Sequence, residues 1–206
     1  MISVILPTYN SEKTLKRSVD SVINQKGSFK IELIIINDFS TDNTKEILEN
    51  DCKSLYSKLV NNDKNMGKGY SCRIGIKNST GDIILIQDAD LEYNPENFNK
   101  LIEPIINGNE KVVYGSRVLP GGKRTRPKTT DFKVRYFANL FLTFLSNILN
   151  KQNLTDCHTC YKVFRSDILK EIELYENGFC FCPEVTAKVS RQGVKIKEVA
   201  IDYFGR

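Results

Sequence analysis

The first 115 residues alternate short apolar stretches with segments of helical periodicity, and this alternation predicts the fold. Strands are expected at residues 2–6, 31–36, 59–60, 83–86 and 111–115, because each is apolar and each is bounded by polar or turn residues. Between them, apolar positions fall at helical spacing, as in the segment that Ser11 is expected to cap. Strand–helix alternation implies right-handed crossovers. We therefore expect an α/β fold, a mostly parallel sheet with helices on both faces.

The chain changes character after Gly115. Residues 136–149 are almost entirely apolar and predict a helix about 21 Å long, too short to span a bilayer. Three interpretations stay open: a core helix, a helix that faces a partner, or a helix lying in a membrane interface beside the neighbouring cations. Strands at 159–164 and 194–203, the second near a sheet edge, and helices around Ile168 and from Pro183 complete an α+β C-terminal part of one domain over residues 1–206.

Composition places the chain among soluble globular proteins, with 40% hydrophobic and 27% charged residues. The N-terminus has no basic segment before its apolar run, so we expect no secretory signal and a cytoplasmic location. The six cysteines are then expected to be reduced. A C-x-x-C at Cys157–Cys160 and a C-x-C at Cys180–Cys182 are not the usual halves of a zinc site, and buried thiols are the expectation.

Positive charge is concentrated in residues 117–135. The whole chain has a net charge of +5, whereas this segment holds seven basic residues against the single acid Asp131. The seven are Arg117, Lys123, Arg124, Arg126, Lys128, Lys133 and Arg135. A nucleotide- or RNA-binding module is one interpretation, but the segment lacks the interleaved aromatic residues that stack on bases.

Acidic residues follow the buried strand at residues 83–86. Asp88 and Asp90 are two apart, so on an extended backbone both would face one site, and Glu92 would add a third oxygen ligand. Such a set suits Mg²⁺ or Mn²⁺ shared with substrate phosphates, and the alternative is a solvated acidic turn. Polar residues also follow the strands at 2–6 and 31–36, and the carboxyl ends of such strands meet at one rim, where ligands bind.

A lysine between two glycines begins the helix that follows residue 66. Gly67, Lys68 and Gly69 match neither the P-loop nor the dinucleotide-binding spacing. A phosphate at this helix start is one interpretation, and a turn with a solvated lysine is the other.

Ordered motifs over nearly the whole chain carry a family resemblance. They are residues 4–10 (VILPTYN), 36–42 (INDFSTD), 88–92 (DADLE), 115–117 (GSR), 155–165 (TDCHTCYKVFR) and 198–203 (EVAIDY). The set resembles family 2 glycosyltransferases of the GT-A fold, in the branch of dolichol-phosphate mannose synthases and polyprenyl-phosphate glycosyltransferases. Departures include Phe39 where glycine is commoner and Glu92 where mannose synthases tend to have glutamine.

The resemblance implies roles for particular residues. Residues expected to bind the nucleotide sugar are Pro7, Thr8, Tyr9, Asp38, Gly67, Lys68, Asp88 and Arg206. Metal ligands would be Asp88, Asp90 and Glu92, and Arg117, Arg135 and Asn139 would bind the acceptor phosphate. The catalytic set would be Asp88, Asp90, Arg117 and Arg135.

The implied reaction is a metal-dependent, inverting transfer of a hexose from a UDP- or GDP-linked sugar to polyprenyl or dolichyl phosphate. Residues 1–115 would then form the nucleotide-sugar half and residues 116–206 the acceptor half, peripheral on the cytoplasmic face of a membrane, with no nucleic-acid partner. A phosphate acceptor is already ionised at pH 7 and needs positioning cations but no general base, so the single histidine, His158, is expected to be structural. The alternative within the family is a soluble sugar, glycan or protein acceptor.

Overall fold

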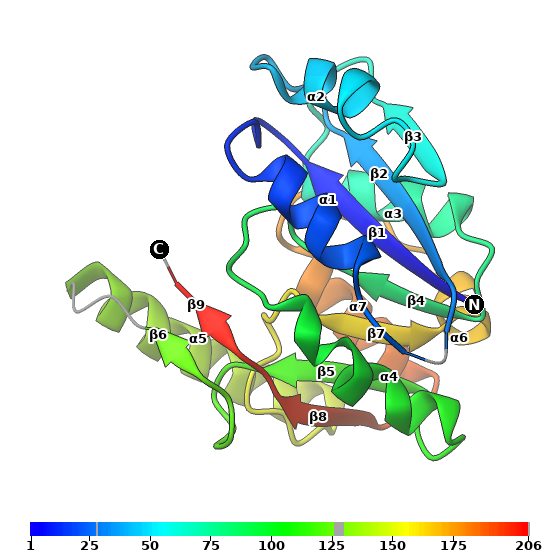
Figure 1. Ribbon diagram of the computed structural model, residues 1–206. Coiled ribbons are helices and arrows are strands. Elements are labelled where there is room, and N and C mark those ends of the chain that lie inside the picture. Colours follow the sequence, from blue (N-terminus) through cyan, green and yellow to red (C-terminus); the bar gives the residue numbers. More distant parts are fainter. Residues whose placement is uncertain (28, 126–129, 206) are drawn as a thin grey trace.

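A seven-stranded sheet forms the centre of the molecule (Figure 1). The computed structural model describes residues 1–27, 29–125 and 130–205, with side chains except at 130–133. In sheet order the strands are β3 (Lys58–Asn61), β2 (Ile31–Asn37), β1 (Ile2–Thr8), β4 (Ile83–Ile86), β7 (Lys162–Arg165), β5 (Val112–Ser116) and β8 (Ile196–Ala200). Only β7 runs antiparallel to its neighbours in this sheet, β4 and β5. The predicted mostly parallel sheet is confirmed, with β8 at an edge.

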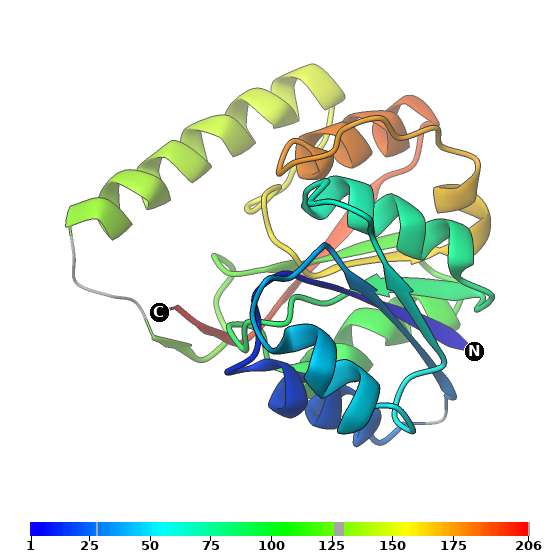
Figure 2. The ribbon, with the colours of Figure 1, turned by 90° about the horizontal axis from the view of Figure 1, so that it is seen from above.

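Helices cover both faces of this sheet, as predicted (Figure 2). One face carries α1 (Leu15–Ile23), α2 (Thr44–Asn50) and α4 (Phe98–Ile106), the last preceded by a 3-10 turn, η1 (Pro95–Asn97). The other face carries α3 (Lys68–Asn78), α6 (Ser166–Lys170) and α7 (Phe181–Arg191). Each layer of helices packs a separate apolar cluster against the sheet. This explains why all four residues of β4 are buried and apolar.

The expected cap of the first helix is wrong. Helix α1 begins at Leu15 with no side-chain cap, because the Ser11 carbonyl accepts the N–H groups of Thr14 and Leu15. The Ser11 hydroxyl instead donates to the carbonyl oxygen of Tyr9 at 3.2 Å. Ser11 thus shapes the loop after β1 through its backbone.

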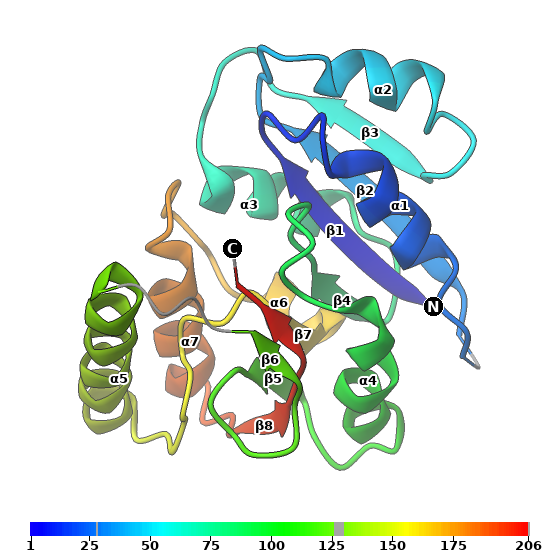
Figure 3. The same cartoon turned by 60° about the vertical axis from the view of Figure 1, so that its left-hand side comes forward.

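Helix α5 (Thr130–Asn150) projects from the body and lies beside α7 near its C-terminal end (Figures 2 and 3). Its described apolar side chains are largely exposed: Phe137 is 67% and Phe141 61% accessible. The core-helix interpretation of residues 136–149 is therefore wrong, because no layer covers this face within the described structure. None of the helices, over the residues described, combines the length and apolar character needed to cross a bilayer.

A small second sheet joins the C-terminal segment to the basic segment. It pairs β6 (Arg124–Thr125) with β9 (Tyr203–Phe204) in parallel. Sequence periodicity did not predict β6, and the single strand expected at 194–203 is interrupted after Ala200. The Phe204 N–H also donates to the Glu92 carbonyl, so β9 lies between the acidic loop and the basic segment.

Candidate active site

A cavity of about 390 Å³ opens at the carboxyl ends of β1, β2 and β4. Its walls come from the loops after these strands, from the start of α3 and from Phe179 ahead of α7. It brings together eight residues predicted from the sequence: Pro7, Thr8, Tyr9, Asp38, Gly67, Lys68, Asp88 and Asp90. We call it the donor pocket. The remaining predicted nucleotide-sugar residue, Arg206, lies outside the described residues.

Asp38 anchors the loop that leads into α3. It is buried at the end of β2, and its carboxylate accepts hydrogen bonds from the backbone N–H groups of Met66 (2.9 Å) and Gly67 (2.8 Å). A third bond comes from the side-chain amide of Asn62, at 2.7 Å. Asp38 therefore shapes the wall of the donor pocket as well as lining it. The next residue, Phe39, has φ +61°, the conformation that explains why glycine is commoner here.

Replacing Asp38 with Asn is expected to loosen this wall. The amide would place an NH₂ group against N–H donors, leaving about 1–3 kcal/mol of hydrogen bonding unsatisfied. We expect a lower free energy of unfolding and weaker nucleotide binding, measured by urea denaturation and by calorimetry. Asp63→Asn, on the exposed part of the same loop, is the control and should change neither. Equal effects of the two substitutions would contradict the anchoring role.

The glycines around Lys68 are required by close packing. Gly67 has φ +91°, and a side chain there would meet the Asn177 carbonyl oxygen at 2.6 Å. A side chain at Gly69 would meet the Glu176 carbonyl oxygen at 2.4 Å. The loop before α7 thus rests directly on the start of α3, and the Tyr70 N–H donates to the Asn177 carbonyl. This contact places Phe179 at the mouth of the donor pocket.

Lys68 and Asp88 form an ion pair in the floor of the donor pocket. The Lys68 Nζ lies 2.5 Å from Asp88 Oδ1, and both side chains are more than four-fifths buried. The same ammonium lies 3.1 Å from Cys160 Sγ. Burial favours the neutral forms, but mutual attraction outweighs it, so the pKa of Asp88 is lowered and that of Lys68 is raised. Burial raises the pKa of Cys160 to about 12, which keeps it a thiol.

The backbone after β4 is a turn, which corrects the expected geometry of the acidic residues. Residues 89–91 turn and Leu91 has φ +64°, so the extended-strand argument for a shared direction is wrong. Asp88 and Asp90 nevertheless line the same pocket. Asp90 Oδ1 accepts the Glu92 N–H at 3.1 Å, which closes the turn. Glu92 Oε2 accepts the Tyr203 hydroxyl at 2.9 Å.

The donor set suits a hard divalent cation held jointly with substrate. Asp88 and Asp90 supply carboxylate oxygens to one cavity, and Mg²⁺ usually keeps waters and takes one or two carboxylates plus substrate phosphates. No group of three or more His, Cys, Asp and Glu side chains is close enough together to hold a metal among the described residues. Asp88 and Asp90 of the donor pocket are the candidate ligands, with Asp88 paired to Lys68 and Glu92 to Tyr203.

Arg117 belongs to a buried network on the other side of this turn. Its Nε and Nη2 donate to the two carboxylate oxygens of the fully buried Asp156, at 2.7 and 2.8 Å. Asn139 of α5 donates to the same carboxylate at 3.2 Å. Asp156 therefore links Arg117 to Asn139, two residues predicted to bind the acceptor phosphate. Sequence reasoning gave Asp156 no role, since nothing in the local pattern marks it as buried.

The remaining predicted residues lie around α5. Arg135 is exposed on α5, one turn before Asn139. His158 is half-buried in a groove between α5 and α7, a cavity of about 920 Å³, and burial lowers its pKa. Cys52, Cys72 and Cys157 are buried free thiols as expected, whereas Cys180 is exposed and Cys160 is half-buried against Lys68.

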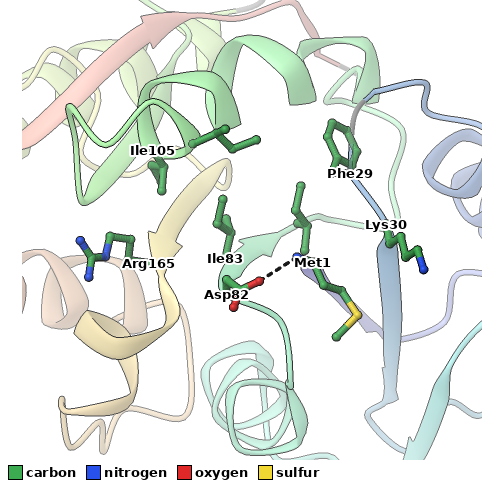
Figure 4. A pocket seen from close by; sticks show the side chains of 9 residues that line it. Met1, Phe29, Lys30, Asp82, Ile83, Ile105 and Arg165 are labelled. Carbon is green, nitrogen blue, oxygen red and sulfur yellow. Dashed lines mark hydrogen bonds and ion pairs between the residues drawn. The ribbon is translucent and has the colours of Figure 1, made fainter.

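Another cavity, of about 520 Å³, lies at the opposite, amino-terminal rim of the sheet (Figure 4). Ile83 and Ile105 form apolar walls, and Asp82 is paired with the Met1 amino group at 2.8 Å. Arg165 is paired with Asp167. Both acid–base pairs here, Met1 with Asp82 and Arg165 with Asp167, are local, and among the described residues no cluster of predicted ones lines this cavity, so we place the chemistry in the donor pocket.

The sheet order and the pocket at its carboxyl rim define an α/β protein of the GT-A type, and comparison of structures agrees. Glucosyl-3-phosphoglycerate synthase from Mycobacterium tuberculosis, crystallised with Mn²⁺ and UDP, has a TM-score of 0.74 at 19% identity over 98% of this chain and 70% of that one. TarS 1–349 from S. aureus has a TM-score of 0.68 at 22% identity, over 99% and 60%. These likenesses establish the fold.

Residues 3–173 match the family described as glycosyl transferase family 2, and the chain belongs to that family. A dolichyl-phosphate beta-glucosyltransferase, ALG5A, of Trichomonas vaginalis is 28% identical over 98% of this chain and 65% of its own length. A dolichol-phosphate mannosyltransferase of Pyrococcus furiosus is 34% identical over 91% and 52%. The resemblance found from the motifs is confirmed, and the chain spans between half and two thirds of these relatives' lengths.

Proposed function

We propose that this chain is a glycosyltransferase that moves a hexose from a UDP- or GDP-linked sugar to a polyprenyl or dolichyl phosphate, using Mg²⁺ or Mn²⁺. The donor pocket carries the proposal, because two carboxylates and a lysine meet there at the ends of β4 and the start of α3. The names of the relatives support the acceptor class.

On the donor side, each group has a definite task. Tyr9 and Asp38 line the end of the pocket where the nucleoside would lie, and Lys68 supplies positive charge for the diphosphate. Asp88 and Asp90 would hold the metal, and Glu92, whose Oε2 accepts the Tyr203 hydroxyl, would be a third ligand. The metal, when bound, stabilises the negative charge of the leaving diphosphate.

On the acceptor side, the task is to position an ionised phosphate. An acceptor phosphate needs no base to deprotonate it, so cations that hold it near the anomeric carbon are sufficient. Arg117, held in place by Asp156, and Arg135 with Asn139 on α5 are our candidates. Attack from the face opposite the diphosphate would invert the anomeric configuration.

The test is a panel of UDP- and GDP-sugars, assayed with Mn²⁺ and polyprenyl phosphate for nucleotide release. We expect release with one donor to depend on the lipid phosphate and to fall strongly in Arg135→Ala. Lys100→Ala, an exposed cation on α4, is the control and should retain activity. Release with a soluble acceptor that Arg135→Ala leaves intact would favour the soluble-acceptor alternative. Tight binding of single-stranded RNA without binding of UDP or GDP would refute the transferase.

The exposed apolar face of α5 leads us to propose that the enzyme is peripheral on a membrane, where its acceptor would reside. Phe137 and Phe141 are one turn apart and both are mostly exposed, beside the cation of Arg135. An apolar face next to basic residues suits the surface of an anionic bilayer.

Replacing Phe137 and Phe141 with Asp should therefore weaken binding to anionic vesicles. Each aromatic side chain is worth about 1.5–3 kcal/mol when it leaves water, so a loss of more than tenfold is expected for the pair. Co-sedimentation with vesicles of phosphatidylserine and phosphatidylcholine measures it. Ile106→Asp, an exposed apolar position on α4, is the matched control. Unchanged sedimentation of the double variant would contradict a membrane role for α5.

A further inference from the structure

Lys68 is paired with a carboxylate, Asp88, that the proposed function assigns to the metal ion. Its ammonium lies 2.5 Å from Asp88 Oδ1 in the floor of the donor pocket, and both groups line that pocket. The ammonium occupies Oδ1, so a metal ion at the same oxygen would be repelled by a second, closely placed cation. Asp88 would have to give up Lys68 to bind the ion through Oδ1.

The contacts of the Lys68 side chain allow it to change its partner. It is the first residue of α3, and its long side chain is anchored by no other carboxylate in the described structure. Its second neighbour, Cys160, is a protonated thiol and holds an ammonium only weakly. Gly67 and Lys68, at the N-terminus of the eleven-residue helix α3, both line the donor pocket, and a helix N-terminus favours an anion such as a diphosphate.

We propose that Lys68 is an internal substitute for the metal ion and exchanges Asp88 for the donor diphosphate when metal and nucleotide enter together. The inference rests on the proposed function, since it takes Asp88 as a ligand of the ion. It assigns Lys68 a positioning role that couples the two binding events. In the empty protein the ammonium neutralises Asp88, and in the loaded protein it neutralises a phosphate oxygen.

Coupled binding follows from this exchange. Metal alone must displace Lys68 with no new anion to receive it, and nucleotide alone meets an ammonium already paired. When metal and nucleotide bind together, Asp88 pairs with the metal and Lys68 with the diphosphate. Each ligand should therefore strengthen the other's binding by about tenfold or more, within the usual range for coupled sites. If the ion pair between Lys68 and Asp88 were only structural, metal and nucleotide would not be expected to strengthen each other's binding.

Two substitutions separate the exchange from a static ion pair. In Lys68→Met, Asp88 is left without its ammonium, so Mn²⁺ alone should bind about tenfold more tightly while UDP or GDP with Mn²⁺ binds more weakly. In Asp88→Asn, Lys68 is released, so UDP or GDP without metal should bind several-fold more tightly. Asp90→Asn removes the same charge from the same pocket and controls for reduced repulsion of the diphosphate. Lys64→Met, exposed on the loop before α3, controls for loss of a lysine.

Isothermal titration of MnCl₂, UDP and GDP, singly and together, measures all of these affinities without turnover. The proposal is overturned if Lys68→Met binds Mn²⁺ no better than the parent, or if Asp88→Asn gains no more metal-free nucleotide affinity than Asp90→Asn. If Lys68→Met does not fold, the comparison of Asp88→Asn with Asp90→Asn decides alone. A parent protein that binds neither nucleotide with Mn²⁺ would refute the proposed function itself, whereas tight but uncoupled binding would refute only the exchange.

Discussion

Replacing Asp88 with Asn is expected to reduce sugar transfer by about 10²–10³-fold, the usual cost of removing one preorganised electrostatic group. Asp88 is a largely buried carboxylate of the donor pocket and the partner of Lys68. If Asp88 holds the metal as we propose, its loss would remove a ligand of the ion that stabilises charge on the leaving diphosphate. Initial rates of nucleotide release, at saturating donor and lipid phosphate, measure the effect.

Asp20→Asn is a matched control for this substitution. Asp20 also pairs with a lysine, Lys16, at 2.6 Å, but on the exposed surface of α1. Its loss should leave the rate unchanged and alter stability by less than about 1 kcal/mol. If Asp88→Asn retained more than a tenth of the parent rate while binding Mn²⁺ as the parent does, Asp88 would not be a metal ligand, and the donor pocket would need a different assignment.

The fold was largely predictable because its central strands are covered on both faces. Residues 83–86 are apolar without alternation, as burial on both faces requires, and they form β4 at the middle of the sheet. A strand was expected at 159–164 and β7 forms at 162–165, but the full burial of Lys162 within it was not predicted. Its ammonium donates to the carbonyl oxygens of Cys157 and Thr159, and partners so close in sequence leave no periodic signal.

The sequence predicted which residues line the candidate site better than it predicted how they are arranged. The carboxyl-end rule for parallel strands placed Tyr9, Asp38 and Asp88 together, and they line one pocket. The turn after Asp88 depends on the φ of Leu91, which the sequence does not reveal. Lys68 begins α3 and Asp88 follows the next strand, β4, so their pairing depends on how the helix packs on the sheet, which the sequence does not reveal.

The sequence also did not predict the environment of Arg117, because its partners lie far from it along the chain. Asp156, from the loop before β7, pairs with Arg117 just after β5, and Glu198 of β8 in turn holds the backbone of Asp156. Glu198 accepts the N–H groups of Thr155 and Asp156, which fixes the loop that carries Asp156. A predicted phosphate ligand is thereby also a structural residue, so its substitution would change both binding and stability.

Asp156→Asn should consequently be the most destabilising of the substitutions considered for this chain. Asp156 is fully buried and accepts both arms of the Arg117 guanidinium. Removing one partner of a buried ion pair leaves the other charge uncompensated and costs about 3–5 kcal/mol. For a chain of this size that corresponds to a fall in Tm of about 6–20 °C. Thermal unfolding followed by circular dichroism measures it.

Asp167→Asn provides the comparison, since Asp167 pairs with Arg165 at the surface, with both side chains about half exposed. This variant should lose less than about 1 kcal/mol. A similar loss in the two variants would show that burial of the Arg117–Asp156 pair adds nothing to stability.

The same pair predicts a pH dependence with a definite sign. Burial alone would raise the pKa of Asp156, but Arg117 outweighs it and holds the pKa below its ordinary value. Since the folded-state pKa is the lower one, the contribution is complete above the unfolded-state value of about 3.9 and is lost as the pH falls through the folded-state pKa. The difference in unfolding free energy between parent and Asp156→Asn should therefore be constant from about pH 5 to 7 and shrink below about pH 4. Urea titrations at intervals between these limits test it, and a difference that grew on acidification would mean that Asp156 is not stabilised as a carboxylate by Arg117.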